Sequence, residues 1–284
     1  MVTANVPMDA FHSSVASART FLFVPGNRPE RFPKAAASAA DLVVIDLEDA
    51  VPDDEKEAAR VAASTWLAAG MSAAVRINGI GTEHCSNDIA AMSGLNGLSA
   101  VVIPMAADSR TIAGVYQMLG ENVEIVALIE TAAGVLNARE IAAAPGVARL
   151  AFGHLDFAAD IQSSVESDAM LYARSTLVMA SRAAGLPGPV DGVTTQLDDY
   201  LVAANDATRS RKLGFTGKLC IHPGQAEGVN AAFMPTDDER TWALRVLSAS
   251  ASGGAVRVGG EMVDAPIVLR AQDILRKSQA GESR

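Results

Sequence analysis

The sequence predicts an α/β fold: a (β/α)8 TIM barrel followed by a C-terminal helix–hairpin–helix extension. Eight short apolar runs recur with starts 21 to 41 residues apart, a spacing that suits strand–helix units with crossover connections. Runs such as LVVI and IVALI are apolar throughout, as expected of parallel strands buried on both faces. Polar and charged residues gather where the runs end, and the carboxyl ends of the strands form the active-site rim of such a barrel.

The predicted strands are separated by Ala-rich segments of helical character. Pro52 followed by three acids is typical of a helix start, and Gly185 with Pro187 marks a helix end. These signals predict helices over residues 53–69, 109–119, 132–143, 168–184 and 197–213, with a longer rim loop at IQSSVESD. The strands open, in order, with TFLFVPG at Thr20, DLVVIDLED at Asp41, AAVRING at Ala73, SAVVIPM at Ser99, VEIVALIE at Val123, VARLAFGHLD at Val147, GPVDG at Gly188 and TGKLCIHP at Thr216.

Three segments follow from this pattern. Residues 1–18 precede the first strand and are expected to be a flexible tail, and residues 19–235 form the barrel. In residues 236–284, TDDERTWALRVLSASA predicts a helix, AVRVGGEMVDAP a hairpin turning at Gly259–Gly260, and IVLRAQDILRK a final helix. Because the barrel is complete before it, this extension is expected to act as a lid or an oligomerisation arm.

Composition excludes several classes of function. No apolar run among the 284 residues approaches the ~18–20 needed to cross a membrane, and the first 18 residues lack the features of a secretory signal. We therefore expect a cytoplasmic protein without a membrane partner. A net charge of −10 argues against nucleic acid, which needs a basic footprint. Cys85 and Cys220, far apart in the chain, are expected to be free thiols.

Two carboxylates are the leading candidates for chemistry. Glu130 and Asp156 follow consecutive predicted strands, which are neighbours in a barrel. Oxygen ligands with open positions around them suit Mg²⁺, which keeps several waters. Position alone leaves an alternative in which Glu130 is a first-turn acid and Asp156 caps a short helix.

A guanidinium and further acids lie on the same predicted rim. Arg76 follows the third strand, where it suits binding of a carboxylate or phosphate, an ion pair with Asp46 or Glu48, or both at once. Strand alternation places Asp46 and Glu48 on one face and Asp49 on the other. Three acids this close favour a metal–water network or raised pKa values, or else cap the following turn. Asp191 at the end of the seventh strand is expected to complete the rim.

Other polar residues carry weaker signals. The four histidines form no cluster with the spacing of a zinc site, and His222 before Pro223 is expected to orient its loop as a donor. Lys218 lies near the start of its strand, the wrong end for a Schiff-base lysine, which favours metal-dependent chemistry. The turn at residues 26–29, followed by basic Arg31 and Lys34, could approach phosphates.

Together, these segments resemble the citrate lyase β-subunit branch of the HpcH/HpaI aldolase family. The resemblance extends from Arg19 almost to the C-terminus. The matching motifs are RTFLFVPGNRPERF, DLVVIDLEDAVPDDEK, VRINGIGT, ALIETAAGV, FGHLDFAAD, GFTGKLCIHPGQ, FMPTDDE and GGEMVDAP.

The resemblance implies an acyl-CoA lyase on a TIM barrel that uses Mg²⁺ and assembles as a homotrimer, with partner lyase subunits in some systems. It implies that Glu130 and Asp156 are the metal ligands and that Glu130 also lies against the substrate. It implies that Arg76 is a catalytic residue that binds a substrate oxygen, and that Glu48 acts in catalysis by supporting the water shell of the metal. It further implies that Asp264, in the M-V-D-x-P motif, is a catalytic acid/base reaching the site of a neighbouring subunit.

The resemblance also places an acyl-CoA channel. Its lining would come from the turn with Pro25, Gly26, Asn27 and Arg28, and from the segment containing His222. Two positions depart from the family pattern: Met105, where many relatives have Lys, and Ile161-Gln162, where Leu-Gly is common. The departures affect the expected acyl group more than the reaction class.

The sequence thus predicts a Mg²⁺-dependent lyase that cleaves a carbon–carbon bond of a citryl-, malyl- or citramalyl-CoA type substrate. Three alternatives remain at this stage. They are a Mg²⁺-dependent aldolase of free 2-keto acids, a malyl-CoA thioesterase, and a non-catalytic acyl-CoA-binding subunit.

Overall fold

The computed structural model describes residues 14–120, 123–166, 168–250, 256–258 and 261–282. The chain divides into two compact units, residues 1–230 and 231–284. The division falls five residues before the predicted boundary between 235 and 236. Each unit is described by itself.

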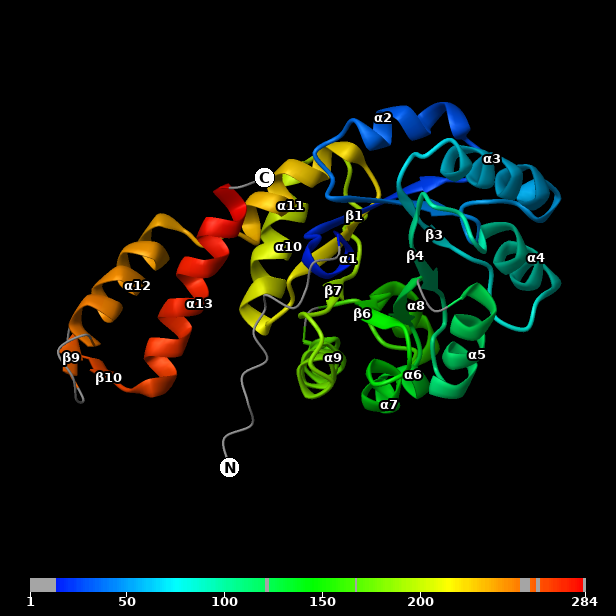
Figure 1. The fold of residues 1–284 in the computed structure, drawn as a ribbon. Helices are drawn as coiled ribbons and strands as arrows, with labels where there is room; N and C mark the ends of the chain where they lie inside the picture. The colour runs from blue at the N-terminus through cyan, green and yellow to red at the C-terminus, as the bar shows by residue number, and fades with distance from the viewer. Residues whose placement is uncertain (1–13, 121–122, 167, 251–255, 259–260, 283–284) are drawn as a thin grey trace. The chain divides into compact units, whose positions relative to one another are not determined.

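The first unit is a closed barrel of eight parallel strands in sequential order, in which β1 also pairs with β8 (Figure 1). This confirms the predicted fold. Strands β2 to β5 are almost fully buried, as their apolar sequences require. The strands are β1 (Thr20–Pro25), β2 (Leu42–Asp46), β3 (Ala73–Arg76), β4 (Leu98–Ile103), β5 (Glu124–Ile129), β6 (Val147–Phe152), β7 (Val190–Asp191) and β8 (Gly217–Cys220).

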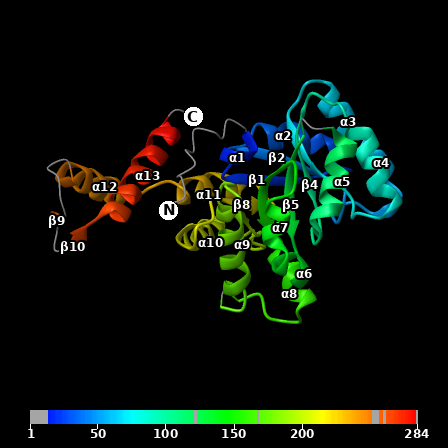
Figure 2. The same cartoon turned by 60° about the horizontal axis from the view of Figure 1, so that its bottom comes forward.

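Helices surround the strands, as the view turned by 60° also shows (Figure 2). The helix predicted over 109–119 has those bounds, whereas that over 132–143 is interrupted at Asn137 and that over 197–213 begins at Tyr200. Helix α4 is not among the helices predicted from the sequence. The helices are α2 (Phe32–Ala36), α3 (Lys56–Ala68), α4 (Glu83–Met92), α5 (Ser109–Leu119), α6 (Ala132–Leu136), α7 (Ala138–Ala142), α8 (His154–Asp160), α9 (Leu171–Ala183), α10 (Tyr200–Leu213) and α11 (Ala226–Ala232), with short 3-10 helices η2 (Pro29–Arg31), η3 (Asp53–Glu55) and η4 (Pro223–Gln225).

Side-chain caps fix where several helices begin. Thr82, Asp108 and Thr131 each accept a hydrogen bond from the backbone N–H three residues later, which satisfies a donor that the first helical turn leaves free. At the other end of α10, Gly214 has φ 105°, a left-handed conformation that stops the helix. These capping residues therefore determine where the helices begin and end.

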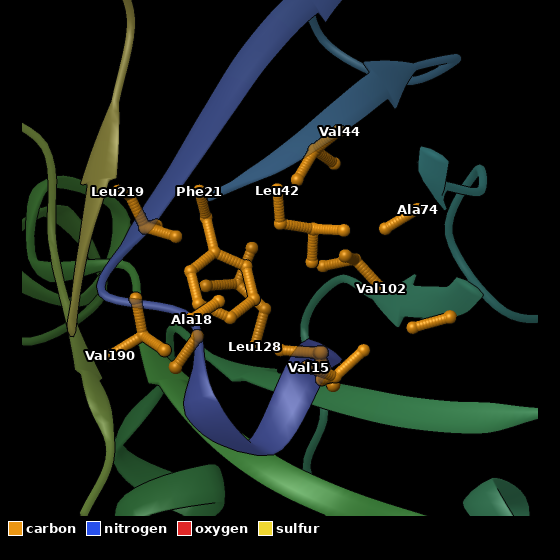
Figure 3. Close-up of a cluster of buried hydrophobic side chains, with 13 residues drawn as sticks. Val15, Ala18, Phe21, Leu42, Val44, Ala74, Val102, Leu128, Val190 and Leu219 are labelled. Carbon is orange, nitrogen blue, oxygen red and sulfur yellow. The ribbon is translucent and has the colours of Figure 1, made fainter. Parts of the chain in front are cut away.

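The amino-terminal end of the barrel is closed by a short helix, α1 (Ser14–Ser17). Val15 and Ala18 are fully buried and pack with Phe21, Leu128 and Val190 in the core (Figure 3). Residues 14–18 are therefore not part of a flexible tail, contrary to the expectation for 1–18, because their apolar side chains fill the bottom of the barrel. Residues 1–13 lie outside the described part of the chain.

Residues 14–18 form a plug at this end of the barrel, and Arg149 on β6 holds the plug by hydrogen bonds. Its guanidinium is fully buried and donates to the carbonyl oxygens of Val15 (2.8 Å), Ala18 (2.7 Å) and Gly188 (2.9 Å), and to Oγ1 of Thr216 (2.6 Å). Burial lowers the pKa of Arg149 to about 9. Helix α1 is too short to supply hydrogen-bond donors for its own carbonyl groups, and the Arg149 side chain supplies these donors instead.

The second unit has the predicted helix–hairpin–helix arrangement. Helix α12 (Asp237–Ser250) and helix α13 (Ala265–Glu282) flank strands β9 (Val256–Val258) and β10 (Glu261–Val263), which pair antiparallel. Ala243, Val246, Val263, Ala271 and Ile274 form its small core. The turn predicted at Gly259–Gly260 lies outside the described residues.

Two further expectations concern membrane-spanning helices and the state of the cysteines. In the described ranges, no helix is both long enough and apolar enough to cross a membrane. Cys85 and Cys220 are free and buried, as expected. Burial raises the pKa of the Cys220 thiol to about 12, so this thiol stays protonated and unreactive.

Replacing Arg149 with Met should lower the free energy of unfolding by about 3 kcal/mol, because several buried carbonyls lose their donor. Urea unfolding measures this loss, and amide exchange at residues 15–18 should become faster. Arg139→Met, on the exposed face of α7, is the control and should change little. A wild-type midpoint for Arg149→Met would mean that the guanidinium does not stabilise the plug.

Candidate functional site

A cavity of about 380 Å³ opens at the carboxyl ends of the barrel strands. It combines apolar walls with a few charged groups, as small-molecule sites do. Within the described part of the chain, four carboxylates and one guanidinium line it, so the cavity is acidic unless a cation binds there. The titratable lining residues are Asp46, Asp49, Arg76, Glu130, His154 and Asp156.

Arg76, the last residue of β3, is held by the last residue of β2. Asp46 and Arg76 are register partners, and their side chains form a bidentate pair with Nε–Oδ1 at 2.7 Å and Nη2–Oδ2 at 2.6 Å. The guanidinium also lies over the Phe23 ring, 5.0 Å from its centroid. Burial alone would lower the pKa of Arg76, but Asp46 and the neighbouring acids outweigh it and raise the pKa. Arg76 therefore stays charged in one orientation.

Two more acids reach Nη1 of Arg76: Glu48 at 2.9 Å and Asp49 at 3.2 Å. The expectation that Asp49 points away from Glu48 is wrong, because β2 and its alternation end at Asp46. Burial raises the pKa of Glu48 to about 7, against the charge of Arg76. Glu48 Oε2 is buried and makes no well-aligned hydrogen bond to the described residues, so it can still accept one from a water molecule.

Glu130 follows β5 and is 3% exposed. The backbone N–H of Met105, just past β4, donates to its Oε2 at 2.8 Å. Burial raises the pKa of Glu130 to about 8 against this hydrogen bond, and the charges of Asp156 and Glu48 add to the rise. A carboxyl in such a place needs a positive partner to be fully ionised at neutral pH.

Asp156 lies in the first turn of α8, is exposed and lines the same cavity as Glu130. The structure therefore brings the two predicted ligands together from consecutive strand ends. No group of three or more His, Cys, Asp or Glu residues in the described ranges could hold a metal. Two carboxylates with open positions nevertheless fit Mg²⁺, because this ion binds through one or two carboxylates and keeps several waters.

Asp191, expected on the rim, lies behind the barrel wall instead. Val190 points into the barrel core, so alternation turns Asp191 outward toward α9 and α10. There Nε of Arg174 donates to it at 3.0 Å and the Ser210 hydroxyl donates to its other oxygen. Its register partner Lys218 also lies behind the wall and donates to a backbone carbonyl, which agrees with its exclusion as a Schiff-base lysine.

His154 lies at the site but is not among the site residues predicted from the sequence. It lines the mouth cavity and also a second, polar cavity of about 60 Å³ that contains Asp191 and Lys218. Burial lowers the pKa of His154 to about 4, so its ring is neutral at pH 7. The available signal was its position two residues after β6, on the same rim as Asp156.

The predicted channel residues form a structured turn. Pro25 lines the cavity, and Gly26 donates its N–H to the Asp46 carbonyl at 2.8 Å. A Cβ on Gly26 would lie 2.8 Å from that oxygen, so this close approach requires glycine. Asn27 Nδ2 donates to Glu55 at 2.6 Å, and exposed Arg28 pairs with Glu30 at 2.7 Å.

His222 caps its own loop. Its Nδ1 accepts a hydrogen bond from the Gly224 N–H at 3.1 Å, so the expected donor is an acceptor at this nitrogen. The imidazole stacks on Tyr200 with ring centroids 5.2 Å apart. The preceding residue, Ile221, lines the cavity.

Asp264 belongs to the second unit, where it is exposed. Its Oδ1 accepts a hydrogen bond from the Ile267 N–H at 3.3 Å at the start of α13. Its role at the site of a neighbouring subunit stays a prediction.

Met105 and Gln162, the positions that depart from the family pattern, share a backbone property. Their φ angles are 50° and 55°, and in the described ranges they are the non-glycine residues with positive φ. This conformation costs a side-chain-bearing residue about 1–2 kcal/mol, and such strain is concentrated at functional sites. At Met105, the positive φ angle accompanies an N–H group that points at Glu130.

Comparisons with known proteins agree with this geometry. Residues 19–223 match the family model described as HpcH/HpaI aldolase/citrate lyase. The chain is 38% identical over 275 residues to a citrate lyase subunit beta-like protein of Deinococcus radiodurans, covering 90% of this chain and 96% of that one. It is 33% identical over 273 residues to a (3S)-malyl-CoA thioesterase of Cereibacter sphaeroides, covering 92% and 95%.

A solved structure is similar along nearly the whole chain. The CitE protein of Mycobacterium tuberculosis, crystallised with magnesium, acetoacetate and coenzyme A, superposes with a TM-score of 0.83 at 34% identity, covering 93% of this chain and 99% of that one. The matches confirm the predicted citrate lyase β-subunit-like branch, and the magnesium of that complex agrees with the predicted cofactor.

Asp46→Asn should lower the free energy of unfolding by about 2–4 kcal/mol, because it removes the charge that compensates a largely buried guanidinium. Chemical denaturation measures the loss, with the exposed Asp54→Asn as control. Equal stability of the two variants would show that the Asp46–Arg76 pair does not organise the mouth.

Proposed function

The chain belongs to the HpcH/HpaI aldolase/citrate lyase family, and from this membership and the mouth geometry we propose that it is a Mg²⁺-dependent acyl-CoA lyase. Its substrate would be a short β-hydroxyacyl-CoA with a distal carboxylate, of the citryl-, malyl- or citramalyl-CoA type. One observation carries the proposal. An oriented guanidinium and a buried carboxylate, Arg76 and Glu130, line one cavity at the carboxyl end of the barrel.

The charge of the cavity supports a cation there. Four lining carboxylates face one guanidinium in the described chain, so an anionic thioester would be repelled without added positive charge. Glu130 and Asp156 are the residues that would hold Mg²⁺, with the water shell supported by Glu48. Bound there, the ion would supply Lewis-acid stabilisation of negative charge on oxygen.

Arg76 would bind a substrate oxygen. Its Nε and Nη2 are engaged by Asp46, whereas Nη1 lies 2.9 Å from Glu48 and 3.2 Å from Asp49, whose side chain is 69% exposed. The Asp49 carboxylate is largely solvated and reaches only this one nitrogen, so a substrate carboxylate or carbonyl oxygen would replace Asp49 while Glu48 stays in place. Asp46 would act as a positioning residue that keeps the guanidinium in place.

The reaction would be a cleavage of the retro-Claisen or retro-aldol type. A base removes the proton of the β-hydroxyl group, the oxygen lone pair forms a carbonyl, and the bond between the α and β carbons breaks. The released electron pair becomes the enolate of the acyl-CoA product, and an acid then protonates its α carbon. Arg76 stabilises the negative oxygen as charge develops, a contribution of about 3 kcal/mol for one preorganised donor.

Two further parts of the proposal concern Asp264 and the path of the CoA moiety. Asp264 would be the acid that reaches a neighbouring subunit, which requires an oligomer, and the family resemblance suggests a trimer. The CoA moiety would enter past Pro25 and the turn at residues 26–28, on the side where Ile221 and His222 also lie. The coenzyme A bound to the M. tuberculosis protein supports a thioester ligand for this chain.

A thioesterase is the second candidate, supported by the (3S)-malyl-CoA thioesterase of C. sphaeroides among the relatives. In that reaction water attacks the thioester and the C–S bond breaks. A panel of hydroxyacyl-CoA thioesters, assayed with and without EDTA, separates the two. A lyase releases a carbonyl product while the thioester remains, whereas a thioesterase releases the free thiol of CoA. Turnover of free hydroxy acids alone would contradict both.

Arg76→Ala should reduce kcat/KM for the preferred thioester about 100- to 1000-fold, because the developing oxygen charge loses a preorganised donor. The exposed Arg110→Ala is the matched control. Circular dichroism checks that both variants are folded. Cleavage by Arg76→Ala at the wild-type rate would remove Arg76 from the reaction.

Glu130→Ala should weaken Mg²⁺ binding at least 10-fold, because the site keeps one of its two carboxylates. Isothermal calorimetry of the protein with MgCl₂ measures the affinity without turnover. Glu140→Ala, on the exposed side of α7, serves as control. Unchanged affinity in Glu130→Ala would exclude this residue as a ligand.

A further inference from the structure

Glu130 is confined by backbone from both neighbouring strands. On one side, the Met105 N–H after β4 donates to Oε2 at 2.8 Å. On the other side lies Gly153, the residue after β6. A Cβ on Gly153 would lie 2.9 Å from the Glu130 carboxylate carbon, and closer still to its Cγ and Oε1. Real Cβ atoms do not approach carboxylates this closely, so no side chain fits here while Glu130 keeps its position.

The backbone of Gly153 does not itself require glycine. Its φ of −90° and ψ of 75° are accessible to alanine. The constraint at this position is therefore the Glu130 side chain and not the dihedral angles. Sequence patterns that look for turn glycines do not detect such a residue.

We propose that the bare Cα of Gly153 and the amide of Met105 form a preformed cradle that fixes the Glu130 carboxylate, and that Gly153 is a positioning residue of the site. The amide occupies Oε2, while Gly153 leaves free the space beside Oε1. Both Gly153 and Glu130 line the mouth cavity. A metal-binding side chain that is already held in one rotamer loses less conformational entropy when the cation binds.

In Gly153→Ala, the new methyl group would collide with the Glu130 side chain, which is the proposed metal ligand. The Glu130 carboxylate must rotate or shift, and this breaks its alignment with the Met105 N–H. The metal part of this inference rests on the proposed function, whereas the steric part does not.

The first experiment compares Gly153→Ala with Gly188→Ala, a control at the opposite end of the barrel. A Cβ at Gly188 would lie 2.5 Å from the Gly214 carbonyl oxygen and 2.8 Å from Thr216, so it carries a similar steric cost away from the mouth. Both variants should melt at lower temperature. Calorimetry with MgCl₂ should show at least a 10-fold loss of affinity for Gly153→Ala and wild-type affinity for Gly188→Ala. Wild-type Mg²⁺ affinity in Gly153→Ala would overturn the cradle.

The second experiment is a double-mutant cycle that needs no metal. Glu130→Ala removes the side chain with which the new methyl group collides, so Gly153→Ala should lower Tm by about 5 °C or more in the wild type and by little in the Glu130→Ala background. If Gly153→Ala does not fold alone, recovery of folding in the double variant gives the same support. Equal losses of Tm in the two backgrounds, or a double variant that does not fold when Glu130→Ala does, would overturn the cradle. Failure of the wild type to bind Mg²⁺ would overturn the proposed function instead, and the cycle would still decide the cradle.

Discussion

The pairing of Arg76 with Asp46 is the interaction on which the mouth of this barrel depends. The two residues end neighbouring strands in register, so the sheet itself delivers the guanidinium to the carboxylate. Three nitrogens of Arg76 are directed at acids, yet Asp49, one of the two acids beside Nη1, is largely exposed. The arrangement combines a buried pair, which fixes the orientation of the guanidinium, with a solvated partner, Asp49, that a ligand can displace.

The barrel uses arginine differently at its two ends. At the amino-terminal end, the donors of Arg149 satisfy carbonyl groups of the plug, including those of Val15 and Ala18, and it stabilises structure without a carboxylate within hydrogen-bond reach in the described chain. At the carboxyl-terminal end, Arg76 is surrounded by acids and retains a donor that faces a cavity. This separation follows the general division of such barrels into a stability face and a catalytic face.

Much of this organisation could be predicted from the sequence, because strand ends are readable from apolar runs. Glu130 and Asp156 follow two such runs and do meet at one cavity. Asp191 also follows an apolar run but lies behind the wall, because one position of alternation decides between the mouth and the helix layer. Met105 could not be recognised as a partner of Glu130, since the contact is made by its amide and depends on a left-handed backbone.

The acidity of the mouth has a consequence for the order of binding. The charges of Asp46 and Arg76 offset each other, so Asp49 and Asp156 leave the described lining of the mouth acidic even without the charge of Glu130. Burial raises the pKa of Glu130 to about 8, so a cation beside this carboxyl group would favour its ionised form. A divalent cation would leave a less negative cavity for a thioester with a distal carboxylate. Cation and anionic substrate should therefore increase each other's affinity, as reciprocal linkage requires.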